Sequence, residues 1–226
     1  MLIGIINDIH YNTGWSSEKI NVVRSCINHL LNVKNVDILV LLGDQTATDP
    51  TYQNDPEEAK SQVEGFWDDL FSGFDLSRVF SVPGNHDSPP ELWYQFSADK
   101  ARHLCPFHIN EGVVDVFLLC THPPGYLYGY TGEYSYTQSR GLIIGKDLLW
   151  LERKLKESKV KGHIKIIFTH HAIYRGGFYQ IDGWDGLITG ASFYNVILNV
   201  IDTEKVLKDN APVISCIGHI LSLIHI

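Results

Sequence analysis

The sequence lacks long hydrophobic runs, paired cysteines and an excess of basic residues. No apolar stretch reaches the roughly 18 residues that a membrane-spanning helix needs, so we expect no membrane span. Residues 1–7 are too short for a secretory leader, which leads us to expect an intracellular, cytoplasmic protein. The four cysteines form no C-x-x-C pair, which argues against a zinc ribbon or a dithiol redox centre and fits free thiols in a reducing compartment.

Basic residues are outnumbered, with 18 Lys and Arg against 26 Asp and Glu and a formal net charge of −8 over 226 residues. Broad nucleic-acid binding depends on clustered Lys and Arg, so this balance argues against it. A small anionic substrate remains compatible with an acidic chain, because bound divalent cations invert the local field.

Apolar runs of strand length alternate with stretches of helical periodicity, which predicts an α/β fold. We expect strands at Leu2–Ile6, Asp37–Leu42, Arg78–Val82, Val113–Cys120, Ile164–Phe168 and Val213–Ile217. Apolar spacing predicts helices at Ser17–Leu31, after the Asp55-Pro56 N-cap, around Leu148–Leu155 and around Phe193–Val200. The expected architecture is a four-layer α-β-β-α sandwich, in which two packed mixed sheets are flanked by helices.

Short polar blocks stand where the predicted strands end: Asp8-Ile9-His10, Gly43-Asp44, Gly84-Asn85-His86-Asp87, Thr169-His170-His171 and Gly218-His219. Hard oxygen ligands and imidazoles at the carboxyl ends of strands from both halves of a chain are what a two-metal hydrolytic site needs. Taken singly, each block has an ordinary explanation. D-x-H is a common accident, a Gly-Asp pair is usually a turn, and the third block could be a polar turn with a satisfied histidine.

The first two blocks offer ligands of distinct kinds. Asp8 and His10 are two residues apart, so in an extended segment they present a carboxylate and an imidazole to one ion. Asp44 follows a glycine that permits a sharp turn, and a carboxylate there can bridge two cations.

The third block offers both a ligand and an acid. Asn85 brings a neutral amide oxygen, and His86 is the natural proton donor or transition-state stabiliser. We expect Asp87 to hydrogen-bond the ring of His86 and to fix its tautomer.

Together these blocks resemble the signature of the calcineurin-like metallophosphoesterase family: D-x-H, G-D-x-x-[D/N], G-N-H-[D/E], a strand-end His, then G-H-x-H. The resemblance covers residues 3–219. It implies two divalent metal ions (Mn, Fe or Zn), held by Asp8, His10, Asp44, Asn85, His170 and His219. Because the family's ligand directly follows the strand, His170 is favoured over His171, which is placed in a supporting position.

The chain departs from this signature at two places. Ala47 stands where the family often has Asp or Asn, and Leu221 replaces the last His, which would help to hold the first metal. Residues 221–226 look like the translation of a transposon-end adapter used for sequencing libraries. We therefore expect a single domain at 1–220 that is incomplete at its C-terminus, a non-native tail at 221–226, and weak binding of the first metal. Restoring Leu221→His with the native downstream strands should recover activity.

The resemblance implies a metal-dependent phosphoester hydrolase, a phosphomonoesterase or phosphodiesterase in which two ions activate a water and His86 protonates the leaving oxygen. The substrate would be a small phosphoester or a phosphoprotein. Arg140 and Arg175 are candidates for contact with its phosphate, or are surface charges. Two alternatives are open: a non-catalytic scaffold with a degraded metal site, and a nuclease. Retention of His86 and Asp87 argues against the first, and the acidic charge balance argues against the second.

Overall fold

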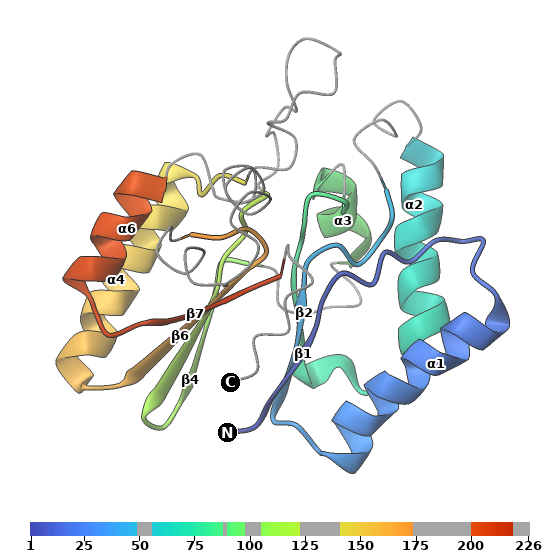
Figure 1. The fold of residues 1–226 in the computed structure, drawn as a ribbon, viewed down its shortest axis with the longest axis horizontal. Coiled ribbons are helices and arrows are strands. Elements are labelled where there is room, and N and C mark those ends of the chain that lie inside the picture. The colour runs from blue at the N-terminus through green and yellow to red at the C-terminus, as the bar shows by residue number, and fades with distance from the viewer. Residues whose placement is uncertain (49–55, 88–89, 98–104, 123–140, 174–199, 219–226) are drawn as a thin grey trace, which may run out of the picture. The chain divides into compact units, whose positions relative to one another are not determined.

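The computed structural model describes residues 1–48, 56–87, 90–97, 105–122, 141–173 and 200–218 (Figure 1). It divides into two compact units, Met1–Cys105 and Pro106–Ile226. Each unit has one sheet and its own helices, as the alternation of strands and helices predicts. The prediction of a single domain at 1–220 and of a non-native tail stays a prediction, and residues 221–226 lie outside the described residues.

The first unit is built on a parallel sheet in the order β1-β2-β3, with strands at Ile3–Ile6, Ile38–Leu42 and Val79–Val82. All five residues of β2 are buried, as expected for the central strand of a parallel sheet. Parallel strands end at the same edge, so the loops after β1, β2 and β3 emerge together.

Helices α1 (Ser17–Asn28), α2 (Pro56–Gly65) and α3 (Pro90–Ser97) belong to the same unit, with π-helical segments at His29–Val33 (η1) and Phe66–Phe71 (η3) and a 3-10 turn at Leu76–Arg78 (η4). Helix α2 begins at Pro56, as predicted. One apolar face is buried along both α2 and η3: Val63, Phe66, Trp67, Leu70 and Phe71. This face forms the core together with the side chains of the sheet.

The second unit carries a mixed sheet in the order β4-β5-β6-β7, at Phe107–Glu111, Val114–Leu118, Ile164–Thr169 and Ile214–Ile217. Strands β4 and β5 are antiparallel, and the other pairs are parallel. Helices α4 (Gly145–Lys161) and α6 (Val200–Asp209) contribute to its core, through Leu151 and Leu155 on α4 and Val206 on α6. The helix expected at Phe193–Val200 lies outside the described residues except for its last residue, where α6 starts.

Strand β4 and helix α3 were not predicted from the sequence. All four cysteines are free thiols, in agreement with the absence of C-x-x-C spacing. Among the described helices, none has the length and apolar character required to cross a bilayer.

Candidate metal centre

Two loops of the first unit run side by side beyond the ends of β1 and β2. The Asp8 N–H donates to the carbonyl of Gly43 (3.1 Å), and the His10 N–H donates to the carbonyl of Asp44 (2.9 Å). The bridge continues one residue further, between Tyr11 and Thr46. The residues that follow β1 and those that follow β2 are thus held in register. This brings Asp8, His10 and Asp44 to one edge of the sheet.

These three residues share an unusual backbone conformation. Asp8, His10 and Asp44 have φ angles of 50°, 48° and 52°, in the left-handed region that non-glycine residues rarely adopt. Such conformations cost on the order of 1–3 kcal/mol each and persist where the surroundings over-determine them, most often at functional sites. The strain falls on the residues that the sequence picks out as metal ligands.

The loop after β3 joins the same edge. The backbone N–H of His86 donates to Oδ1 of Asp44 (2.8 Å), which ties the third polar block to the second. Asn85 precedes it in this loop and is buried, with 6% of its surface exposed. Three loops from three parallel strands therefore bring five of the predicted site residues together: Asp8, His10, Asp44, Asn85 and His86.

Asp87 differs from its expected role. Its carboxylate accepts from the backbone N–H groups of Gly84 (2.8 Å) and Thr46 (2.8 Å) and from the Thr46 hydroxyl (3.0 Å). The structure gives it no hydrogen bond to the His86 ring; instead, the Thr48 hydroxyl donates to the main-chain carbonyl of His86. Asp87 therefore fastens the second loop to the third, because a fully buried carboxylate takes the nearest N–H and O–H donors.

The carboxylates of Asp44 and Asp87 lie close together at this edge of the sheet. Burial, and then the nearby carboxylate of Asp44, raise the pKa of Asp87 to about 7, although hydrogen bonds from the backbone act in the opposite direction. A bound cation would relieve this repulsion between buried carboxylates.

The ligand atoms converge at distances that suit a shared ion. One donor atom from each of His10, Asp44 and His86 lies within 4.8 Å of the other two. Nε2 of His10 is 3.9 Å from Oδ1 of Asp8 and 3.8 Å from Oδ2 of Asp44. The rings of His10 and His86 meet edge to face, with centroids 4.7 Å apart.

These separations are too long for hydrogen bonds. Two ligand atoms that each lie about 2.1 Å from a common cation are separated by roughly 3–4.2 Å, depending on the coordination angle. The residues present therefore fit a divalent cation in spacing and in donor chemistry, which combines carboxylate oxygen with imidazole nitrogen.

In the second unit, His170 and His171 follow β6 and are fully buried. Nδ1 of His171 lies 2.8 Å from the Thr121 hydroxyl, and a side chain at Gly141 would collide with the same ring. His171 is thus fixed by the loop after β5, and its auxiliary role stays a prediction. The assignment of His170 as the ligand stays a prediction, and His219, Arg140 and Arg175 lie outside the described residues.

Several residues at these strand ends were missed by sequence reasoning. His122 follows β5 by four residues and is fully buried, and Thr46 and Thr48 support the third loop. A signal for His122 existed, because Thr121-His122 is also a polar block that follows an apolar run. Thr46 and Thr48 gave no such signal in the sequence, because the hydrogen-bond partner of a hydroxyl depends on how the chain folds.

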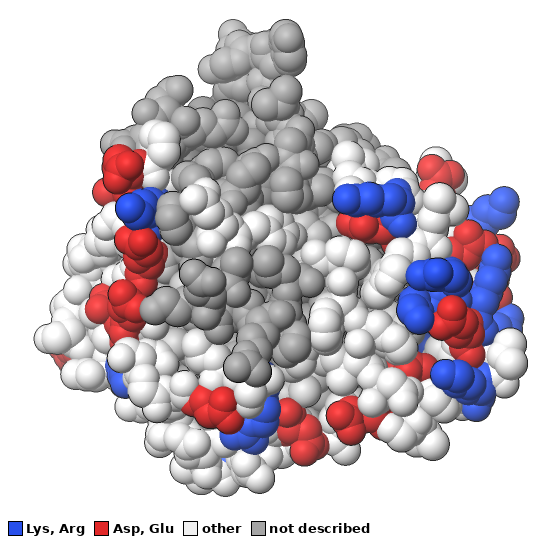
Figure 2. All heavy atoms as spheres, turned by 180° about the vertical axis from the view of Figure 1, so that it is seen from behind, with Lys and Arg blue, Asp and Glu red and all other residues white. Residues whose placement is uncertain are grey.

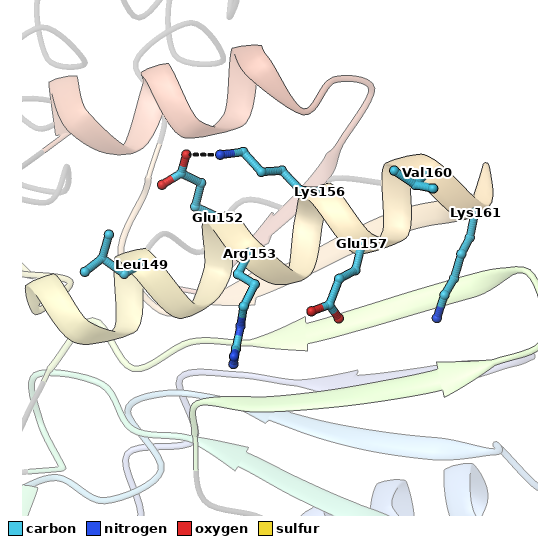
Figure 3. A pocket seen from close by; sticks show the side chains of 7 residues that line it. All are labelled: Leu149, Glu152, Arg153, Lys156, Glu157, Val160 and Lys161. Atoms are coloured by element: carbon cyan, nitrogen blue, oxygen red, sulfur yellow. Dashed lines mark hydrogen bonds and ion pairs between the residues drawn. The ribbon is translucent and has the colours of Figure 1, made fainter.

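A pocket on the second unit is separate from these residues. It lies along α4 and is lined by seven side chains of mixed character: Leu149, Glu152, Arg153, Lys156, Glu157, Val160 and Lys161 (Figure 3). The ion pair Lys156–Glu152 (2.5 Å) spans one helical turn within it. None of the predicted metal or catalytic residues lines this pocket, so it is not the candidate centre.

Comparison with known proteins adds a family and a fold. The family model described as calcineurin-like phosphoesterase matches residues 1–222. A crystal structure of a dimetal phosphatase from Danio rerio is similar, with a TM-score of 0.62 and 15% sequence identity, over 93% of this chain and 78% of that one. No curated protein matches. At this identity the structural likeness shows the fold alone, which is the expected α/β class with two sheets and flanking helices.

Proposed function

Because the chain belongs to the calcineurin-like phosphoesterase family, we propose that metal-dependent phosphoester hydrolysis takes place at the loops after β1, β2 and β3, with His86 as the proton donor. The observation that carries the proposal is the convergence of His10, Asp44 and His86 within 4.8 Å. The similar structure from Danio rerio is that of a dimetal phosphatase, which supports a requirement for two divalent ions.

In the proposed site Asp8, His10 and Asp44 hold a cation, and Asn85 contributes its amide oxygen from the third loop. Divalent cations, when bound, neutralise the phosphoryl oxygens and lower the pKa of a water molecule. The donor set contains no thiolate, which suits Mn²⁺, Fe or Zn²⁺.

His86 is placed to act on the leaving group. Its backbone is held by Asp44 through the N–H and by Thr48 through the carbonyl, so the ring is carried by a fixed loop. A positioned imidazole that passes a ring N–H proton to the departing oxygen contributes about 10²–10⁴-fold to the rate. The T-shaped contact with His10 keeps that ring beside the ligands.

The surface supports a small phosphoester or phosphoprotein over nucleic acid. On the face that Figure 2 shows, the acidic and basic side chains of the described residues are interspersed and form no continuous basic track. Nucleic-acid binding draws most of its affinity from such tracks. We also propose a reducing compartment, such as the cytoplasm, because all four cysteines are free thiols.

The test uses aryl phosphates with different leaving groups. The chain with Mn²⁺ should hydrolyse 4-nitrophenyl phosphate or its bis-ester, and a chelator should stop the reaction. His86→Asn should slow phenyl phosphate by about 10²–10⁴-fold and 4-nitrophenyl phosphate by much less, because a good leaving group needs no proton. The Mn²⁺ content measured by mass spectrometry should not change.

The exposed His29 of η1 provides the matched control, and His29→Asn should leave both rates unchanged. If His86→Asn lost its metal together with its activity, His86 would be a ligand instead of the acid. The proposed activity would be wrong if Mn²⁺ stimulated no phosphoester hydrolysis even after Leu221→His and the native downstream strands had been introduced.

A further inference from the structure

We propose that Tyr11 is a positioning residue for the metal centre, which fixes the loop carrying His10 through a hydrogen bond to Asp69. The inference rests on the proposed role of His10 as a metal ligand. It concerns a residue outside the ligand set, whose hydroxyl points away from the loops toward the helices of the first unit.

The backbone of Tyr11 joins the two ligand loops. Its N–H donates to the carbonyl of Gln45 (2.8 Å), and its carbonyl accepts from the N–H of Ala47 (2.8 Å). These bonds fix the residue directly after His10 relative to the loop that carries Asp44. Any amino acid could make them, so they do not explain why a tyrosine stands here.

The side chain adds an anchor 58 residues away in sequence. Tyr11 is 2% exposed, and its hydroxyl donates to Oδ2 of Asp69 on η3 at 2.5 Å. The acceptor is itself held, because Arg24 of α1 donates to the main-chain carbonyls of Asp69 (2.9 Å) and Ser72 (2.9 Å). The loop carrying His10 is thereby tied to two helical elements that contribute nothing else to the site.

The space around the hydroxyl is shaped to its size. A Cβ placed at Gly65, the last residue of α2, would lie 2.6 Å from the Tyr11 oxygen. The rings of Trp15 and Phe66 contact the Tyr11 ring, with centroids 5.4 and 6.2 Å away. The ring therefore has little room to shift, and the position of its Cα is fixed by side-chain packing as well as by main-chain bonds.

A buried tyrosine with a satisfied hydroxyl is also common as plain core material. The difference here is its neighbour: His10 has φ 48°, a conformation that relaxes unless the surroundings hold it. Loss of the Tyr11 anchor should let the His10 backbone relax and spread its imidazole over several positions. The predicted consequence is weaker metal binding and not merely a less stable fold.

The test is calorimetric titration of the metal-free full chain with Mn²⁺. Tyr11→Phe removes only the hydroxyl and should raise the Mn²⁺ Kd about 10-fold or more, the loss typical of residues that support a ligand. Turnover should fall at limiting Mn²⁺ and recover at high Mn²⁺. Tyr94→Phe is the matched control, because it removes a half-buried hydroxyl that contacts Cys105 in the same unit, and its Kd should stay within about two-fold of wild type.

A second variant displaces the hydroxyl instead of removing it. Gly65→Ala places a Cβ 2.6 Å from the Tyr11 oxygen, so it should weaken Mn²⁺ binding, and the overpacking should also lower the melting temperature of the metal-free chain. The Kd is therefore measured well below that melting temperature, where the variant is folded. If wild type and Tyr11→Phe bind Mn²⁺ equally, the inference is overturned while the proposed function stands. If Mn²⁺ binds neither to wild type nor to the chain with Leu221→His and the downstream strands restored, the proposed function fails and the inference falls with it.

Discussion

At the scale of single residues, the backbone strain of the metal centre is concentrated in Asp8, His10 and Asp44. Asp, Asn and His tolerate the left-handed region better than other non-glycine residues. The residue types that bind a cation are therefore also those that can occupy these turns with least strain. The sequence indicated an extended segment at Asp8 and His10, and the positive φ angles of both residues correct that expectation.

Asp44→Asn should stabilise the metal-free chain and abolish its Mn²⁺ binding. Asparagine keeps the left-handed preference and an oxygen that can accept from the His86 N–H, but removes one buried negative charge beside Asp87. Relief of that repulsion is expected to be on the order of 1 kcal/mol, or about 2–4 °C in melting temperature.

Thermal melts with and without Mn²⁺ measure both effects. Asp68→Asn, at an exposed position of η3, removes the same charge away from the loops and should shift neither value. An Asp44→Asn variant that melts below wild type without metal would contradict this account of the crowded carboxylates.

Other residue roles could not be predicted. The sequence indicated Asp87 as a partner for the His86 ring, whereas its carboxylate accepts from Gly84 and Thr46. Likewise Tyr11 appears in the sequence as one aromatic among many. Partners separated by 41 or 58 residues are set by how the strands and helices pack, which no local pattern records.

At the scale of elements, the predicted strands and helices agree with the structure wherever burial alone determines the pattern. The strand expected at Asp37–Leu42 is observed at Ile38–Leu42 and is wholly buried. Helix α1 ends at Asn28, where the expectation was Leu31, because the chain continues as the π-helical η1. The pattern of apolar residues does not distinguish these two kinds of helical turn.

Strand β4 was missed for a different physical reason. His108 and Asn110 hydrogen-bond the buried Asp115 of β5, at 2.7 Å each. The alternation of apolar and polar residues is present at residues 107–110, but it is only four residues long, which is the shortest pattern that indicates a strand.

Gly162→Ala should destabilise the second unit. Gly162 ends α4 with φ 71°, where alanine is strained, and the change should cost about 1 kcal/mol. Gly145→Ala, at the other end of the same helix, meets open space and should be neutral or mildly stabilising. Urea unfolding of the pair gives the comparison, and equal stability of the two variants would show that the C-terminal turn of α4 tolerates a side chain.

At the scale of the whole molecule, the resemblance to one family predicted the fold class and the reaction, because the motifs recur in order along nearly the entire chain. Substrate choice did not follow, since selectivity depends on loops whose sequences follow no shared signature. The chain's stability also depends on polar clusters that no motif records, such as the one around Asp115.

Asp115→Asn should lower the free energy of unfolding, by roughly 1.5–3 kcal/mol at pH 7, because hydrogen bonds to a charged group are lost. Burial opposes ionisation of Asp115, but contacts from Ser158, Asn110, His108 and His163 outweigh it and hold its pKa well below the usual range. The unfolded chain therefore binds more protons than the folded chain below about pH 4. The contribution of Asp115 is complete above that pH and is lost as the pH falls toward the folded pKa.

Urea unfolding at pH 7 and pH 3 measures this difference. The gap between wild type and Asp115→Asn should shrink at the lower pH. Glu111→Gln, an exposed change at the end of β4, serves as the control and should show a small, pH-independent effect. A gap that widened in acid would contradict the assignment of Asp115 as an ionised anchor.

The bonds that join the loops after β2 and β3, from Thr46 to Asp87 and from His86 to Asp44, have an evolutionary consequence. Homologous recombination with a crossover between residues 48 and 84 would separate both pairs of partners. Because the donors of both bonds are main-chain N–H groups, a chimaera made this way keeps them only when one parent supplies the Asp44 carboxylate and the other supplies the Asp87 carboxylate. These loops should accordingly be inherited as one block, and diversification of the enzyme is expected in segments that share no such cross-links.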